Sequence, residues 1–278
     1  MRTRALGFGL LTVTGLARRG FFIPHRYAER VRPSDYPALV PLFAAAEERF
    51  LGVLAEIERH VDRLAGFQGP PPQPRFDQDW FSRLDAAAAY AMVRRERPRL
   101  VVEVGSGHST RFLARALADV GEGGELVAVD PAPRADLAGL PIVLHRALLQ
   151  ETEPALFQRL RAGDILFVDS SHVAQPGTDV DHLVGHVVPA LAAGVLLHVH
   201  DIFLPDPYPA DWAWRGYNEQ TVIAALLACG GFELAFASHW LRTRRGGRLA
   251  ALDRLPRVAG ARETSLWLRK TSGPAGGS

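Results

Sequence analysis

Residues 101–110 read VVEVGSGHST, and this stretch gives the strongest indication of the fold that we expect for the chain. Two glycines, Gly105 and Gly107, follow a short apolar run, and Ser109 and Thr110 come directly after them. Glycine adopts backbone angles that other residues avoid and lets a ligand approach the main chain, while a serine or threonine hydroxyl can cap a helix. The stretch therefore predicts a strand, a tight turn that faces a ligand, and the start of a helix.

The residues around the two glycines indicate which ligand the turn binds. A dinucleotide-binding loop has a third glycine at the position of Thr110, where a pyrophosphate meets the helix. Glu103 would repel a phosphate but suits a cationic amino-acid ligand. Asp130 ends the next apolar run, 125–129, where an acidic side chain can bind ribose hydroxyls. Asp130 could instead cap a helix before Pro131.

The rest of the chain alternates short apolar runs with amphipathic stretches. Because apolar strands separated by helices are typical of a parallel sheet covered on both faces, we expect an α/β fold with a doubly wound, mostly parallel, seven-stranded sheet. The last two strands are expected to pair antiparallel at the edge of the sheet. The expected strands are residues 100–104, 125–129, 142–144, 165–168, 195–199, 232–237 and 264–268. The expected helices among them are residues 84–95, 110–117, 154–160 and 180–191.

The loop and the acidic strand end resemble the class I S-adenosylmethionine-dependent methyltransferases, whose cofactor loop has the pattern Glu-x-Gly-x-Gly. The resemblance covers about residues 76–268 and is greatest to the methyltransferase family 24 group, some of which are sugar or macrolide O-methyltransferases. It implies a Rossmann-like methyltransferase fold and S-adenosylmethionine as the cofactor. The segments that resemble this group are residues 103–110, 167–172, 200–205 and 218–220.

The same resemblance assigns the cofactor contacts. It implies that Glu103, Gly105 and Gly107 hold the methionine part of the cofactor and that Asp130 holds its ribose. The full set of cofactor-binding residues that we predict is Glu103, Gly105, Ser106, Gly107, Ser109, Asp130 and Asp169.

Polar residues that end the fourth and fifth strands are the candidates for catalysis. Ligands in such sheets bind outside the carboxyl ends of the strands, so Asp169 and His172 should face the cleft, and His200 and Asp201 should lie beside them. A hydroxyl acceptor is a poor nucleophile at neutral pH and needs a base or a metal. His172 or His200 could be that base, although either histidine could also be a surface or capping residue.

A metal is the alternative to a histidine base. Asp169, His200 and Asp201 resemble the metal position of magnesium-dependent O-methyltransferases, with His200 standing where those proteins usually have an acid. Imidazole is a poorer ligand for magnesium than for softer metals, so we favour the histidine mechanism. The Pro- and aromatic-rich segment 204–214 could cover the acceptor or could be a rigid surface loop.

Composition limits the other choices. The chain has 278 residues, 47% of them hydrophobic, and its net charge of +2 does not predict a nucleic-acid partner. Its one cysteine, Cys229, indicates a reducing compartment, which is why we expect a cytoplasmic protein. We divide the chain into an N-terminal part, 1–74, with an apolar segment, a helical extension and a Pro-rich linker, a cofactor-binding methyltransferase domain, 75–270, and a disordered tail, 271–278.

The apolar segment 5–17 lies between arginines and resembles a signal peptide, but it is too short to span a bilayer, which takes about 20 apolar residues. We expect it to pack on the domain or on a membrane surface. The function that we predict is transfer of a methyl group to a hydroxyl of a small molecule. The alternatives are an NAD(P)-dependent oxidoreductase on a similar fold and a non-catalytic cofactor-binding protein; self-association is left open.

Overall fold

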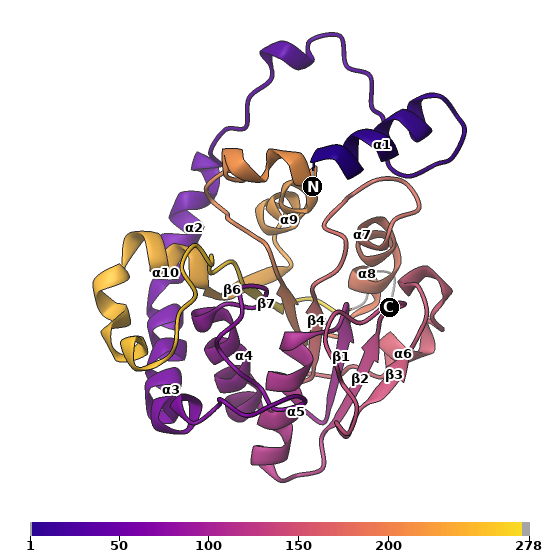
Figure 1. Ribbon diagram of the computed structural model, residues 1–278. Coiled ribbons are helices and arrows are strands. Elements are labelled where there is room, and N and C mark those ends of the chain that lie inside the picture. The colour runs from indigo at the N-terminus through magenta and orange to yellow at the C-terminus, as the bar shows by residue number, and fades with distance from the viewer. Residues whose placement is uncertain (1, 274–278) are drawn as a thin grey trace. The chain divides into compact units, whose positions relative to one another are not determined.

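The computed structural model describes residues 2–273 of the chain. The chain divides into two compact units, Met1–Ser34 and Asp35–Ser278. The second unit contains the whole sheet and all of the predicted site residues (Figure 1).

The second unit is built on one seven-stranded sheet with the order β3-β2-β1-β4-β5-β7-β6. Strands β1 to β5 run parallel, and β7 pairs antiparallel with both β5 and β6. The strands are β1 (Leu100–Val104), β2 (Glu125–Val129), β3 (Val143–His145), β4 (Ile165–Val168), β5 (Leu196–Val199), β6 (Phe232–Ala237) and β7 (Leu266–Lys270). The predicted fold class is thus confirmed. The third and fifth strands start one residue later than expected, and the seventh starts two residues later.

Two long helices, the amphipathic α3 and the largely buried α4, precede the sheet, and most of the helices between the strands are shorter. The α-helices are α1 (Arg2–Val13), α2 (Val40–Ala45), α3 (Glu47–Ala65), α4 (Arg83–Glu96), α5 (His108–Val120), α6 (Ala155–Gln158), α7 (Asp179–His182), α8 (Val188–Ala190), α9 (Glu219–Ala228) and α10 (Ser238–Arg244). The 3-10 helices are η1 (Ala28–Arg30), η2 (Pro37–Leu39), η3 (Leu149–Glu151), η5 (Ala210–Arg215) and η6 (Gly246–Arg254), and a π-helical turn, η4 (Leu183–Val187), joins α7 to α8.

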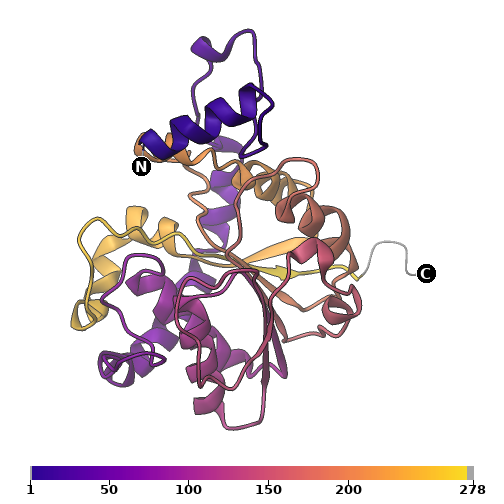
Figure 2. The same ribbon diagram turned by 45° about the vertical axis from the view of Figure 1, so that its right-hand side comes forward.

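Helices cover both faces of the sheet. α3, α4 and α5 pack side by side on one face, and the helices between β3 and β5 lie on the other (Figures 1 and 2). The central strands are therefore buried on both sides, which explains why β1 and β4 are almost wholly apolar. Between the layers, Phe112 and Phe167 both pack edge-on against Phe81.

The two units divide at residues 34 and 35, so α3 belongs with the sheet, and it packs along α4. The first unit holds α1 and η1. No helix among residues 2–273 is long and apolar enough to cross a membrane. The predicted disordered tail, 271–278, lies outside the described residues from position 274 onward.

The order of the strands places a switch point between β1 and β4. The chain moves from β1 outward to β2 and β3, and then returns to place β4 on the other side of β1. Loops that leave the carboxyl ends of two such strands diverge, and the crevice between them is the usual ligand site of an open α/β sheet.

Gly105, the first residue after β1, fits this switch point closely. Its φ is +79°, a left-handed conformation that favours glycine, and a Cβ atom at this position would lie 1.9 Å from the carbonyl oxygen of Asp169. The glycine loop can therefore pack against the end of β4 only because position 105 has no side chain.

We expect Gly105→Ala to destabilise the protein more than Gly121→Ala. Both glycines have the same left-handed φ, +79° and +78°, but a Cβ at Gly121 would meet nothing within 4 Å. In the Gly121 variant the free energy of unfolding should fall by about 1–2 kcal/mol, the cost of a left-handed alanine. In the Gly105 variant it should fall by about 1–3 kcal/mol more, because the backbone at Asp169 must move. Chemical denaturation measures both losses, and equal losses would contradict the close contact with Asp169.

Candidate functional site

The backbone ladder of the sheet continues one residue past the strands and sets the row of residues at the site. Gly105, Asp169 and His200 are the first residues after β1, β4 and β5. Each donates its N–H to the carbonyl of the last residue in a neighbouring strand, at 3.0, 2.9 and 2.9 Å. Because these strands end in register, the three residues meet at one edge of the sheet, as predicted.

Glu103 is buried beneath the glycine loop with no exposed surface. The hydroxyl of Ser109 donates to its Oε1 at 2.6 Å. Among the described residues, no hydrogen-bond donor reaches its Oε2. Burial raises the pKa of Glu103 to about 8, so this carboxyl holds a proton over much of the neutral range. Ser109 therefore faces Glu103 and not the open side of the loop.

Asp130, which follows β2, holds the glycine loop in place by hydrogen bonds. Its Oδ2 accepts hydrogen bonds from the N–H of Ser106 at 2.6 Å and from the Ser106 hydroxyl at 3.0 Å. Its Oδ1 accepts from the N–H of Ala132 at 2.7 Å. Thr110, which replaces the third glycine, accepts from the N–H of Gly107 at 2.9 Å. These bonds fix the loop and leave lone pairs on Asp130 for further donors.

Four side chains at the ends of β4 and β5 form a compact cluster in which imidazoles and carboxylates alternate. His172 Nε2 lies 3.3 Å from Asp169 and 3.6 Å from Asp201. His200 Nδ1 lies 3.5 Å from a carboxylate oxygen of each of the same two aspartates. The structure thus brings together all four residues that the sequence predicted for catalysis or metal binding.

The backbone at this cluster is strained. His172 has a φ of +59° and Asp201 a φ of +55°, and among the described residues only Arg97 is a third non-glycine with a positive φ. Such conformations cost of order 1–3 kcal/mol each and persist where the surroundings impose them. Here they turn the His172 and Asp201 side chains toward the same point, which links the strain to the cluster.

Two further buried carboxylates stand behind the histidines, and the sequence predicted neither as a partner of a histidine. Glu219, at the start of α9, lies 2.8 Å from His172 Nδ1. Asp85, in α4, lies 3.4 Å from His200 Nε2. The carboxylate of Asp85 also accepts the N–H groups of Thr264 and Ser265 at 2.9 and 3.0 Å. The only signal for either residue was an acidic side chain in the first turn of a helix, which is also a common position for an ordinary helix cap.

The cluster shifts the pKa values of its members. Burial alone would lower the pKa of each imidazole, but the carboxylates around them outweigh it and raise the pKa of His172 and of His200 well above the usual value. Burial would raise the pKa of Asp169, but the two histidines hold it well below its usual range. His198, two residues before His200, behaves differently: it stacks on Phe167 in the core, and burial lowers its pKa.

A cavity of about 240 Å³ opens beside the cluster. His200, Asp169 and Asp201 line it, whereas His172 lies behind them. The rest of the wall includes three arginines, three aromatic side chains and one more carboxylate: Arg134, Arg215, Arg262, Trp80, Trp212, Tyr217 and Asp79. The aromatic-rich segment 204–214 therefore contributes Trp212 to the wall, while Trp214 is 61% exposed.

The predicted metal position was Asp169, His200 and Asp201. Across residues 2–273, no group of three or more His, Cys, Asp or Glu side chains has the arrangement of a metal site. Both carboxylates here face imidazole nitrogens at ion-pair distances. The metal set stays a prediction that a chelator can test.

Comparison with known proteins agrees with this geometry. Residues 102–202 match the model of a protein family described as a methyltransferase domain, methyltransferase family 24. No curated protein sequence matches the chain.

Several solved structures resemble the chain at low identity. A methyltransferase of Podospora anserina, PaMTH1, bound to S-adenosylhomocysteine is 14% identical, with 91% of this chain and 100% of that chain covered and a TM-score of 0.44. The O-methyltransferase TomG of Streptomyces achromogenes, in complex with S-adenosylmethionine, is 17% identical over 80% and 89% of the chains, with a TM-score of 0.43. A branched-chain polyamine synthase of Thermus thermophilus is 16% identical over 78% and 65%, with a TM-score of 0.46. At identities this low, the substrate of one protein says nothing of the substrate of the other.

The family match begins inside β1 and ends at Ile202, so it includes the glycine loop, the acidic end of β2, and both histidine-bearing strand ends. The strand order and the two-glycine turn after Glu103 agree with it. Residues 102–202 therefore form a methyltransferase domain of the family 24 type.

Proposed function

We propose that the protein transfers the methyl group of S-adenosylmethionine to a hydroxyl group of a small molecule, with His200 as the base. The observation that carries the proposal is the position of His200, which lines the cavity while Asp85 holds its far ring nitrogen. The family match sets aside the nicotinamide alternative.

The cofactor residues of this proposal are those of the glycine loop and its neighbours: Glu103, Gly105, Ser106, Gly107, Ser109, Asp130 and Asp169. Glu103 supports the assignment because its buried Oε2 has no donor among residues 2–273. An ammonium group bound there would donate to this oxygen and favour the ionised form of the carboxyl. Asp130 supports it through lone pairs that could accept ribose hydroxyls. Ser109 would act through Glu103, to which it donates.

The bound cofactor supplies a methyl group that a positively charged sulfur already activates, so the protein must align the hydroxyl, remove its proton and exclude water. We propose that the hydroxyl docks beside His200 Nδ1 and Asp169. A hydrogen bond from Nε2–H to Asp85 would leave Nδ1 as the proton acceptor, provided that the imidazole is neutral. His172, which is absent from the cavity wall, would be a positioning residue that orients Asp169 and Asp201.

We expect His200→Ala to lower kcat by roughly 10²–10⁴, the usual share of a general base, and chelator to leave the unchanged protein active. The rate of the unchanged protein should rise as pH increases above neutrality, because the raised pKa of His200 keeps the imidazole protonated until then. The measurement is homocysteine release over a panel of hydroxylated small molecules. His186→Ala is the matched control, since it removes an exposed imidazole.

The same assay distinguishes the alternatives. If chelator abolishes turnover and added metal restores it, Asp169, His200 and Asp201 are metal ligands and the base proposal is wrong. Full activity of both His172→Ala and His200→Ala, with chelator harmless, would contradict both mechanisms. Cofactor binding without turnover on any acceptor would favour a non-catalytic role.

A second expectation concerns Glu103 and pH. The pKa of this carboxyl is about 8 in the folded protein and near 4.5 in the unfolded chain. Between these two pH values the folded protein keeps the proton and the unfolded chain has lost it. Stability should therefore fall as pH rises from 4.5 to 8. Glu103→Gln removes that loss, so its melting temperature relative to the unchanged protein should rise across this interval.

The cofactor proposal adds a test to this pH series. If an ammonium group binds at Glu103, S-adenosylhomocysteine should raise the melting temperature of the unchanged protein more than that of Glu103→Gln. A difference in melting temperature that stays constant from pH 5 to 8.5 would contradict the buried ionisation, and equal ligand shifts would remove Glu103 from the cofactor site.

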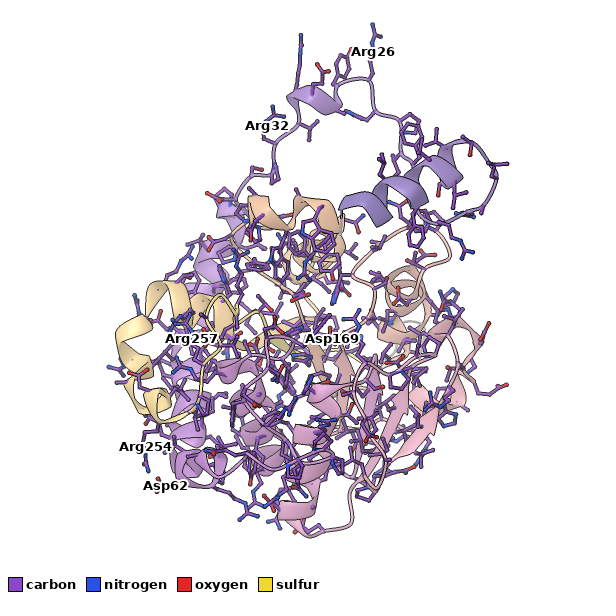
Figure 3. The ribbon with its side chains drawn as sticks, viewed as in Figure 1. Arg26, Arg32, Asp62, Asp169, Arg254 and Arg257 are labelled. Atoms are coloured by element: carbon purple, nitrogen blue, oxygen red, sulfur yellow. The ribbon has the colours of Figure 1, made fainter. Side chains whose placement is uncertain are left out.

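We also propose that the first unit binds an anionic membrane surface. Residues 1–34 contain seven arginines and one acidic residue, Glu29. Large apolar side chains on the same unit are exposed, among them Leu6 (66%), Leu16 (79%) and Phe22 (65%). Figure 3 shows Arg26 and Arg32 extending outward from the ribbon of this unit. Basic and apolar residues together are typical of segments that lie on anionic lipid.

We expect the full chain to sediment with vesicles of phosphatidylcholine and phosphatidylserine, but not with phosphatidylcholine alone. Arg18→Gln with Arg19→Gln should weaken that binding on the order of 30-fold, at about 1 kcal/mol for each arginine. Arg254→Gln, a change in the second unit, is the control. Equal binding to both vesicles would contradict the proposal, as would a mature protein cleaved near Ala17 and found outside the cytoplasm.

A further inference from the structure

Two arginines from distant parts of the chain meet on one aromatic ring in the cavity wall. Arg215 ends η5, and Arg262 lies in the segment before β7. The guanidinium carbon of Arg215 is 3.9 Å from the centre of the Trp212 ring, and that of Arg262 is 5.6 Å from it. Stacking on a tryptophan fixes a guanidinium and leaves its edge available for hydrogen bonds.

The protein pairs Arg215 only weakly. Its nearest carboxylate oxygen belongs to Asp201, at 3.8 Å, and Asp201 also lies near both histidines. Its Nη1 donates to the hydroxyl of Tyr217 at 3.2 Å. Among the described residues, its buried Nε has no acceptor. A guanidinium that gives up water without gaining acceptors is unfavourable by itself.

Arg262 is in a similar state. Its Nη2 donates to both carboxylate oxygens of Asp211 at 3.0 Å, but the Asp211 side chain is 66% exposed, and a pair of that kind contributes little. Its Nη1 is buried and has no acceptor within residues 2–273. Both guanidiniums thus retain hydrogen-bonding capacity at the cavity, where their side chains are 28% and 36% exposed.

The other carboxylates of the wall leave these two buried N–H groups without an acceptor. Asp169 and Asp201 face imidazole nitrogens within 3.6 Å. Asp79 is the remaining carboxylate of the wall, and Arg134, over the ring of Trp80 at 4.9 Å, is its third arginine. Within the described part of the chain, Arg215 Nε and Arg262 Nη1 therefore remain free to bind an acceptor from a ligand.

We propose that the methyl acceptor carries an anionic group, a carboxylate or a phosphate, which Arg215 and Arg262 bind beside Trp212. This inference rests on the proposed methyl transfer to a hydroxyl, because it assigns a second binding contact to the molecule that carries that hydroxyl. Asp201 connects the two positions, since it contacts His200 on one side and Arg215 on the other. Arginine binds carboxylate and phosphate alike through parallel N–H···O bonds, so the site requires a negatively charged group and either anion can supply it.

The test is calorimetry on the full chain in the presence of S-adenosylhomocysteine. The probes are 4-hydroxybenzoate, 4-hydroxyphenyl phosphate and the neutral 4-hydroxybenzamide, and the two anions distinguish the source of the charge. At least one anion should bind more tightly than the amide, and added salt should weaken it. Arg215→Gln and Arg262→Gln should each lose 10- to 100-fold in anion affinity, the range for a charged hydrogen bond.

Arg254→Gln is the matched control, because Arg254 is paired with Asp62 well away from Asp169 (Figure 3). It should bind the anions as the unchanged protein does. All variants should keep their melting temperature and their affinity for S-adenosylhomocysteine, which excludes misfolding. No preference for either anion over the amide, or full anion affinity in both arginine variants, overturns the inference.

A separate assay of methyl transfer distinguishes a failure of the proposed function from a failure of the anion site. If an anion binds through the two arginines but no hydroxylated compound of the panel is methylated, the proposed function fails while the anion site stands. If the amide is methylated as well as the anions and the arginine variants are unimpaired, the function stands while the anion site fails.

Discussion

The site depends on backbone hydrogen bonds that extend the parallel ladder one residue beyond the strands. They align Gly105, Asp169 and His200 along one edge of the sheet through main-chain atoms alone. Only a glycine fits at the first position, because the carbonyl of Asp169 occupies the space of a Cβ. The glycine loop and the cluster at the ends of β4 and β5 are therefore parts of one packing arrangement.

Within that frame, the histidine cluster follows one electrostatic rule. Buried carboxylates require positive partners, and buried imidazoles take protons only when carboxylates surround them. Asp85 and Glu219 supply the outer carboxylates, each from a helix on a different part of the fold. His198 shows the contrast: without a carboxylate in contact it stays neutral and serves as a core side chain.

Local pattern was enough to predict most elements of the fold. The apolar runs at β1, β2, β4 and β6 have the predicted bounds, because strands buried on both faces have few polar residues and are delimited by turns. Predictions were less accurate where packing decides the bounds. The predicted helix 180–191 is divided among α7, a π-helical turn and α8, and the predicted helix 154–160 keeps only four residues.

The order of the elements, the two-glycine turn and the acidic and histidine residues after β2, β4 and β5 could all be predicted from the chain, since each depends on neighbours in sequence. Three contacts could be found only in the folded protein: Asp130 holds Ser106, Glu219 lies behind His172, and two arginines 47 positions apart share the Trp212 ring. Contacts of this kind form between residues that are distant in sequence. They exist because the sheet fixes the ends of its strands in space, and no periodicity or spacing in the chain specifies that distance.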